Sequence, residues 1–200
     1  MLFRSGYGQL GDGSTENSAT PVAVSGITTA VALAVGFLHS CAFLADGTVR
    51  CWGYNLYGQV GDGTTQNRIQ SVPATGIDDA VGITAGSEFT CALLADRTAR
   101  CWGYNHYGQL GDGGTSDRSV PGVVSGLTSA VAISAGRNQA CAVITDGTLR
   151  CWGHNDFGQL GDGTTTHRPA PVVATDISTA VAIATGEPHT CALLTSGTVR

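Results

Sequence analysis

The sequence has few charged residues and no long apolar run. Charged residues make up 12% of the 200 residues, and the formal net charge is −5. Proteins that bind a phosphate backbone usually carry a basic stripe, so we expect no nucleic-acid partner. The longest apolar runs, such as Ala30–Val35, are far shorter than the roughly 20 residues that a membrane-spanning helix needs. We therefore expect no membrane insertion.

The usual signatures of catalysis and of metal binding are also missing. There is no G-x-x-x-x-G-K loop for phosphates and no C-x2-C pair for zinc. Each Gly-Asp-Gly turn supplies one carboxylate, whereas a calcium loop needs several oxygen ligands. Apart from His39 and His189, which share one phase of the repeat described next, the histidines fall at different phases, with no recurring Ser or Asp partner that would suggest a triad. We expect no enzyme activity, no cofactor and no metal site; the histidines are His39, His106, His154, His167 and His189.

What the sequence does contain is a repeat of fifty residues without insertion or deletion. Cys-Trp-Gly copies begin at Cys51, Cys101 and Cys151, and a degraded copy begins at Met1. A fixed period of this size is typical of solenoids, propellers and arrays. We divide the chain into one repeat domain, 1–200, with repeats 1–50, 51–100, 101–150 and 151–200. Both ends cut the repeat at the same phase, so we expect a piece of a longer protein, truncated at both ends.

Each repeat predicts four short strands and no helix. A Pro-led apolar piece at 21–24, 121–124 and 171–174, replaced in the second repeat by Ser-Val-Pro-Ala at 71–74, suits an outer strand because proline lacks an N–H. Small apolar residues at 30–36, 80–86, 130–136 and 180–186 suit an inner strand packed on both faces. A hairpin follows, 40–44 with 48–52, around a three-residue loop whose last residue is left-handed. Arg97 takes that place in the second repeat, at a cost of roughly 1 kcal/mol.

Four-stranded units repeated about an axis predict an all-β fold, a β-propeller of antiparallel blades. A strand-based solenoid is the alternative, although its rungs are usually shorter than fifty residues. The tryptophans that follow each cysteine are expected to pack between blades. The in-phase glutamines are expected to satisfy backbone groups, and the Gly-Asp-Gly aspartates to form turns. These residues are Trp52, Trp102 and Trp152; Gln9, Gln59, Gln109 and Gln159; and Asp12, Asp62, Asp112 and Asp162.

The cysteines fall in cross-strand register within the predicted hairpins. A three-residue loop at 45–47 places Cys41 opposite Cys51, with β-carbons roughly 4.5–5.5 Å apart, close to disulfide geometry. The same register predicts Cys91–Cys101 and Cys141–Cys151, each bridge contributing about 2–3 kcal/mol, and leaves Cys191 without a partner. Disulfides would indicate an extracellular, periplasmic or cell-surface protein. Reduced, buried cysteines in a cytoplasmic protein are the alternative.

The residues also resemble the regulator of chromosome condensation repeat. The resemblance rests on the stretch from Trp102 to Gly113, on the Ala135-Gly136 step and on the run from Cys191 to Leu194, and it extends over essentially the whole chain. It implies a seven-bladed propeller, of which four repeats would form an open arc. Relatives in this family include an exchange factor for a nuclear GTPase, a plant ultraviolet-B receptor and a bacterial β-lactamase inhibitor. The Gly-Trp-Arg-His-Thr run of the photoreceptor is absent here.

Comparison of the repeats with one another separates scaffold from variable positions. The residues directly after the Ala-Gly step differ most, and they should rim one face near the central axis. Variable loops on a rigid scaffold are the usual place of recognition, although unconstrained surface drift would give the same variation. We predict that these residues bind a partner: Phe37, Leu38, Ser87, Glu88, Arg137, Asn138, Glu187 and Pro188. Two further variable sets are Leu56, His106 and Asp156, and the pairs at 66–67, 116–117 and 166–167.

The sequence therefore favours a non-enzymatic scaffold that presents variable loops to a protein partner of unknown identity. The resemblance offers an alternative, a regulator of a small GTPase that resembles a guanine nucleotide exchange factor. That activity depends on a wedge inserted in one blade, and no complete repeat here has an insertion. The disulfide interpretation offers another alternative, an inhibitor of a secreted enzyme.

Overall fold

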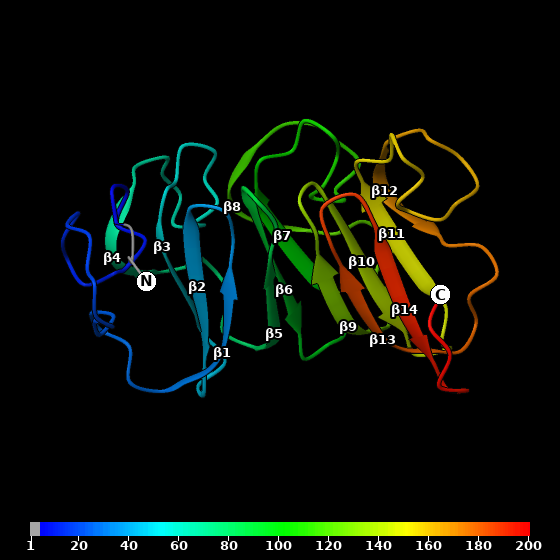
Figure 1. Ribbon diagram of the computed structural model, residues 1–200, viewed down its shortest axis with the longest axis horizontal. Helices are drawn as coiled ribbons and strands as arrows, with labels where there is room; N and C mark the ends of the chain where they lie inside the picture. The colour runs from blue at the N-terminus through cyan, green and yellow to red at the C-terminus, as the bar shows by residue number, and fades with distance from the viewer. Residues whose placement is uncertain (1–4) are drawn as a thin grey trace.

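A computed structural model describes residues 5–200 (Figure 1). Residues 1–4, which align with the Cys-Trp-Gly-Tyr of the later repeats, lie outside this range. Within it the chain forms fourteen β-strands and no α-helix, so no helix is present there that could cross a membrane. The expectation of an all-β chain without helices is confirmed.

The strands form antiparallel sheets in chain order, with three sheets of four strands and one of two. The first sheet is β1 (Ala30–Val35), β2 (His39–Leu44), β3 (Val49–Gly53) and β4 (Arg68–Pro73). The second is β5 (Ala80–Ala85), β6 (Phe89–Leu94), β7 (Ala99–Gly103) and β8 (Arg118–Val123). The third is β9 (Ala130–Ala135), β10 (Gln139–Ile144), β11 (Leu149–Gly153) and β12 (Arg168–Val173). The last is β13 (Ala180–Thr185) and β14 (Thr190–Leu194).

The sheets are out of phase with the sequence repeat. The outer strand β4 pairs with β3, the hairpin strand that spans the boundary between residues 50 and 51. The chain leaves β3, turns through the Gly-Asp-Gly loop and folds back beside the strand it has just left, as sequential strands commonly do. The outer strands therefore begin three residues before the predicted Pro-led pieces. The Pro-led piece predicted at residues 21–24 forms no strand.

The hairpins follow the predicted register. Cys41 is paired with Cys51 across β2 and β3, and the equivalent cysteines pair in the next two sheets. Disulfides join all three pairs, with Cα atoms 4.0–4.1 Å apart, and Cys191 is free and exposed. Arg97 has a φ of 67°, where Gly47 and Gly147 have 83° and 81°. The predicted left-handed turn residue is confirmed at each of these places.

The core lies between successive sheets. Trp102, from the second sheet, shares one buried cluster with Cys41 and Val49 from the first. Trp152 packs in the same way against Phe89 and the other residues of the second sheet. The tryptophans therefore pack between blades, as predicted. Together the sheets form an open arc of propeller blades (Figure 1).

The inner strands are less buried than expected. β1, β5, β9 and β13 lie side by side along the arc. The valine at the second position of each strand is at least half exposed: Val31 at 63%, Val81 at 54%, Val131 at 50% and Val181 at 52%. The prediction that small residues pack these strands on both faces was wrong for this row. That side of the inner strands is therefore open to solvent.

Candidate functional site

The loops after the inner strands form a rigid rim, at residues 36–38, 86–88, 136–138 and 186–188. The Phe37 N–H donates to the Ser87 carbonyl at 3.0 Å, and the Ser87 N–H donates to the Arg137 carbonyl at 3.0 Å. The glycine at the start of each loop is required by close approach. A β-carbon on Gly86 would lie 2.6 Å from the Gly136 carbonyl oxygen of the next blade. The first three rim loops are thus tied together by their backbones, and the Gln139 side-chain amide donates to the Gly186 carbonyl of the fourth at 2.9 Å.

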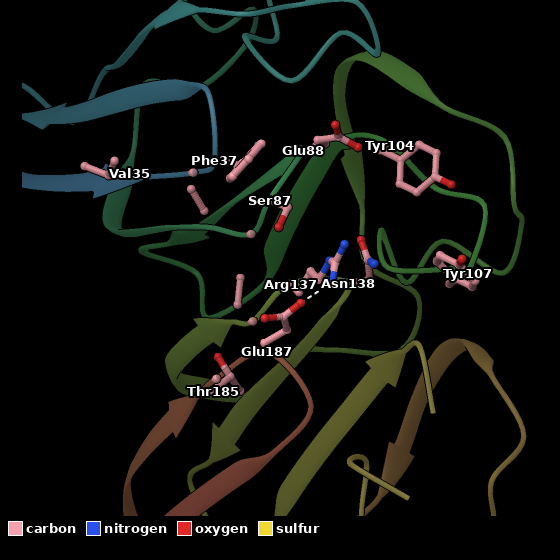
Figure 2. Close-up of a pocket in the computed structure, with 16 residues that line it drawn as sticks. Val35, Phe37, Ser87, Glu88, Tyr104, Tyr107, Arg137, Asn138, Thr185 and Glu187 are labelled. Atoms are coloured by element: carbon pink, nitrogen blue, oxygen red, sulfur yellow. Dashed lines mark hydrogen bonds and ion pairs between the residues drawn. The ribbon is translucent and has the colours of Figure 1, made fainter. Parts of the chain in front are cut away.

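The rim surrounds an open cavity of about 680 Å³ (Figure 2). The cavity collects loop residues from four consecutive repeats. Six of the eight residues predicted to bind a partner line it, and Leu38 and Pro188 do not. The six are Phe37, Ser87, Glu88, Arg137, Asn138 and Glu187. Phe37 is 75% exposed, an unusual position for a large apolar side chain on a rigid loop.

One ion pair crosses between blades inside this rim. The Arg137 guanidinium contacts the Glu187 carboxylate, and both side chains are largely exposed (Figure 2). Such exposed pairs contribute only about 0–1 kcal/mol to stability. The pair therefore shapes the charge of the rim rather than holding the blades together.

A belt of aromatic rings runs along the same face, and sequence reasoning missed it. Tyr7 packs on Tyr54, Tyr57 on Tyr104, and Tyr107 on His154, with ring centroids 4.7–5.0 Å apart and steep interplanar angles. Rings within one repeat, such as Tyr54 and Tyr57, lie 6.2–6.3 Å apart. Tyr104 and Tyr107 also line the cavity. The signal was available, because in each of the last three repeats the x-N-x-x segment has an aromatic ring or histidine at its first and last positions.

The two other variable sets lie against this aromatic belt. The His106 ring is 4.6 Å from that of Tyr104, and the His167 ring is 5.1 Å from that of Tyr107. All three variable sets therefore share one face, the upper edge in Figure 1, while the hairpin turns occupy the lower edge. The three variable sets, which are separate in the sequence, therefore lie together in the structure.

Glu88 is the most unusual charge on this face. Its side chain is half-buried beside Tyr104 (Figure 2). Burial raises its pKa, nearby Arg137 lowers it, and the Asp117 carboxylate raises it again, for a net increase. Burial chiefly, with contributions from neighbouring tyrosines and from the charge of Glu88, also raises the pKa values of Tyr54 and Tyr104. Glu88 and Tyr104 both line the cavity, and the Tyr104 N–H donates to the Glu88 carbonyl at 2.9 Å.

Two histidines and an aspartate at one end of the belt form a cluster of possible metal ligands. Ligand atoms of His154, Asp156 and His167 all lie within 4.8 Å of one another. Their hydrogen bonds oppose coordination. The Asn155 N–H donates to Nδ1 of His167 at 3.1 Å, and the Gln159 side-chain amide donates to Nδ1 of His154 at 2.7 Å. Both neutral rings then carry their proton on Nε2, facing Asp156, and neither Nε2 offers a lone pair to a cation.

Comparison between repeats supports this assignment for His167. At the equivalent positions, Asn67 and Asp117 accept the same backbone hydrogen bond through a side-chain oxygen, at 2.9 and 2.8 Å. Accepting that bond is therefore the structural role of the position. His167 accepts this bond through Nδ1. A metal bound to the ring would therefore displace a hydrogen bond that the equivalent loops of this chain also make.

The remaining motif residues build the loops. The side-chain oxygen of Gln59 accepts the Tyr57 N–H at 3.0 Å, as the sequence predicted for the in-phase glutamines. Asp62 accepts bonds from Thr64 and Arg68, which outweigh burial and lower its pKa. No role was predicted for Asn55. Its side chain is fully buried, and its amide donates hydrogen bonds to the carbonyls of Thr64 and Gln66 across the loop. The segment from Cys-Trp-Gly to Gly-Asp-Gly, the most regular motif in the sequence, therefore has a structural role.

Comparison with protein families agrees with this architecture. Two models described as the regulator of chromosome condensation repeat match the chain, one at residues 46–93, 101–143 and 146–193, the other at 30–59, 80–109 and 130–159. The chain belongs to this repeat family. The family shows the fold and leaves the function open, because one fold can carry unrelated activities.

Several solved structures are similar to this chain. Yeast RCC1 (Prp20), in a structure bound to Kap60, is 21% identical with a TM-score of 0.75, covering 92% of this chain and 45% of its own. Human WBSCR16 is 20% identical with a TM-score of 0.56, covering 96% and 66%. The ectodomain of the Physcomitrella patens receptor kinase CR4 is 26% identical with a TM-score of 0.56, covering 88% and 41%. The chain thus spans less than half the length of the yeast structure.

Proposed function

We propose that this chain is a non-enzymatic scaffold that holds a protein partner on the rim and aromatic belt. The observation that carries the proposal is that variable loops from different blades meet at one cavity. Loop residues that vary most between repeats come from four blades and line one cavity with an exposed phenylalanine at its edge. A rigid, backbone-linked rim limits the conformational entropy that a partner's binding would cost.

The lining of the cavity supports a binding role over a catalytic one. It holds no histidine and no cysteine among the described residues, so neither a Ser–His nor a Cys–His pair is complete there. Its exposed rings and mixed charges suit a protein surface, where aromatic side chains and arginine are enriched.

Structures of similar proteins add support by analogy. Yeast RCC1 (Prp20) was solved bound to Kap60, and another Prp20p structure from Saccharomyces cerevisiae is described with its binding to Gsp1p and histones. These partners belong to those proteins. The loops of this chain keep one length in every complete repeat, so the exchange-factor alternative has no protruding wedge among the described residues. A nucleotide-release assay on small GTPases tests that alternative, and acceleration would revive it.

The proposed location is outside the cytoplasm. Three disulfides and similarity to a receptor ectodomain support an extracellular, periplasmic or cell-surface protein. This location is consistent with a second candidate function, in which the chain binds and inhibits a secreted enzyme.

The test is capture of partners by the immobilised chain, with variants on both faces. Phe37→Ala and Glu88→Lys alter the rim, and Asp78→Lys makes the same kind of charge change near the hairpin turn at Gly47 on the opposite edge. We expect the two rim variants to lower capture of the bound protein about tenfold or more, as central interface residues do, and Asp78→Lys to leave it unchanged. Equal capture by all three variants would assign the partner to another surface.

A further inference from the structure

We propose that copies of this chain associate head to tail, through two apolar faces at the opposite ends of the described arc (Figure 1). The leading face lies on the first sheet, and the trailing face lies on the last hairpin. Each face is one half of a joint that occurs complete between successive sheets. The inference is independent of the proposed function, because neither face belongs to the rim or the belt and the test needs no partner.

The complete joints between successive sheets share one arrangement. The isoleucine at the fourth position of an inner strand packs against a buried cluster that contains hairpin residues of the preceding sheet. Ile183 is packed in this way against the cluster of Cys141, Val143 and Leu149. The other two joints have the same composition: Ile133 with Cys91, Leu93 and Ala99, and Ile83 with Cys41, Phe43 and Val49. Each joint therefore consists of a cysteine hairpin and a sheet that receives it.

The leading face is the receiving half of such a joint. A small cluster holds its residues: Ala42, Leu44 and Trp52, with Val24 and Ile27 packed against it. The equivalent residues fifty positions later all belong to the complete cluster that contains Cys41 and Val49. Leu33 takes the place of the packed isoleucines, and its side chain is 67% exposed. The leading face therefore lacks only the hairpin of a preceding sheet.

The trailing face is the hairpin half of the joint. Leu193 and Val199 are 40% and 63% exposed, whereas their equivalents Val143 and Leu149 are 1% and 2% exposed. Cys191 is exposed as well, although the cysteines at its position in the other repeats are buried. The two end faces thus expose the two sets of apolar residues that are buried against each other at the three internal joints.

A second copy of the chain fits both faces. The trailing hairpin of one copy carries cysteine, leucine and valine where the internal hairpins carry cysteine and residues of the same apolar class. The leading face of the next copy carries the receiving residues in the internal order. Exposed apolar patches of this kind mark association surfaces. Because the two faces differ, the interface is heterologous, so the copies close into a ring or continue as a filament.

The experiment measures the mass of the chain in solution by sedimentation velocity at increasing concentration, with one variant on each face. Leu33→Asp places a charge on the leading face, and Val199→Asp places one on the trailing face. We expect the unaltered chain to associate and each variant alone to associate about a hundredfold more weakly, because an unpaired charge would be buried in the joint. Val131→Asp makes the same change at a half-exposed inner-strand residue on neither face, and it should associate like the unaltered chain.

A mixture of the two variants distinguishes head-to-tail association from other arrangements. Leu33→Asp chains keep an intact trailing face, and Val199→Asp chains keep an intact leading face. The equimolar mixture should therefore form a one-to-one dimer that does not grow, which also shows that both variants are folded. A chain that stays monomeric would overturn the proposal. Loss of association in only one variant would also overturn it, because the dimer would then pair two identical faces.

A disulfide cross-link tests the register of the joint. Between the last two sheets, the Ser134 hydroxyl lies 2.7 Å from the Thr185 hydroxyl. The equivalent positions across the proposed joint are Ala184 of one copy and Val35 of the next. In a Cys191→Ala background, a mixture of Ala184→Cys chains and Val35→Cys chains should form linked dimers on mild oxidation, and neither variant should do so alone. Equal cross-linking by either variant alone would contradict the proposed register.

Discussion

His39 shows how one buried position can hold different side chains in successive blades. Its imidazole is 1% exposed, and Nε2 lies 2.9 Å from the Thr90 hydroxyl, which itself donates to the Gln59 carbonyl. Nε2 must therefore donate, and Nδ1 is buried with no partner. Phe89 and Gln139 fill the same place in the next two blades, also fully buried. Burial lowers the pKa of His39 to about 4.

That depressed pKa predicts acid sensitivity in a defined window. The neutral form is favoured in the folded state, so its contribution is complete above the unfolded pKa near 6.5 and is lost as the pH falls toward 4. The loss reaches about 3 kcal/mol in that range, from the difference between the two pKa values. His39→Gln, which copies Gln139, should remove this part of the pH dependence. Urea unfolding at several pH values tests it, and identical slopes for both proteins would contradict the assignment.

Arg97 predicts a stabilising substitution. It occupies a left-handed turn position with a φ of 67°, a conformation that costs an L-residue roughly 1 kcal/mol. Arg97→Gly should raise the free energy of unfolding by up to about 1 kcal/mol, less the entropy that glycine loses on folding. The reverse change at Gly197, where a β-carbon would meet open space, should lower it by a similar amount. Denaturant midpoints measure both changes, and a destabilised Arg97→Gly variant would show that the arginine side chain contributes contacts.

At the scale of the element, the hairpin and its disulfide form the unit that the sequence predicted best. A fixed loop length determines the register, and the register brings each pair of cysteines into direct opposition. The outer strands were placed less well, because their pairing partner lies across the repeat boundary and strand propensity alone does not reveal it. The aromatic belt was not predicted, although an aromatic ring or histidine recurs on both sides of the asparagine in each of the last three repeats.

The disulfides predict a matched pair of stability changes. Cys91→Ala with Cys101→Ala should lower the free energy of unfolding by about 2–3 kcal/mol, the value for closing a short loop. Cys191→Ala, at an exposed free thiol, should change it by less than about 0.5 kcal/mol. Thiol titration of the unfolded, unreduced protein should find one reactive group. Seven would show that the cysteines are reduced and would remove the main support for an oxidising compartment.

At the scale of the whole molecule, the fifty-residue period predicted the architecture but only part of the candidate site. A fifty-residue period with four strand signals was enough for antiparallel blades in an arc. Six of the eight rim residues were placed at the cavity because they follow the inner strands in every blade. Leu38 and Pro188 were not, since backbone position alone does not fix where a side chain points.

The central claim is that a partner binds the face formed by the rim and the aromatic belt. Hydrogen exchange of the chain, alone and with a captured partner, tests it most directly. The account predicts slower exchange at 36–38, 86–88 and 136–138 and in the loops that carry Tyr54, Tyr57, Tyr104 and Tyr107, with no change at the hairpin turns around Gly47, Arg97 and Gly147. Protection at those turns or along the outer strands, with the rim unchanged, would contradict it.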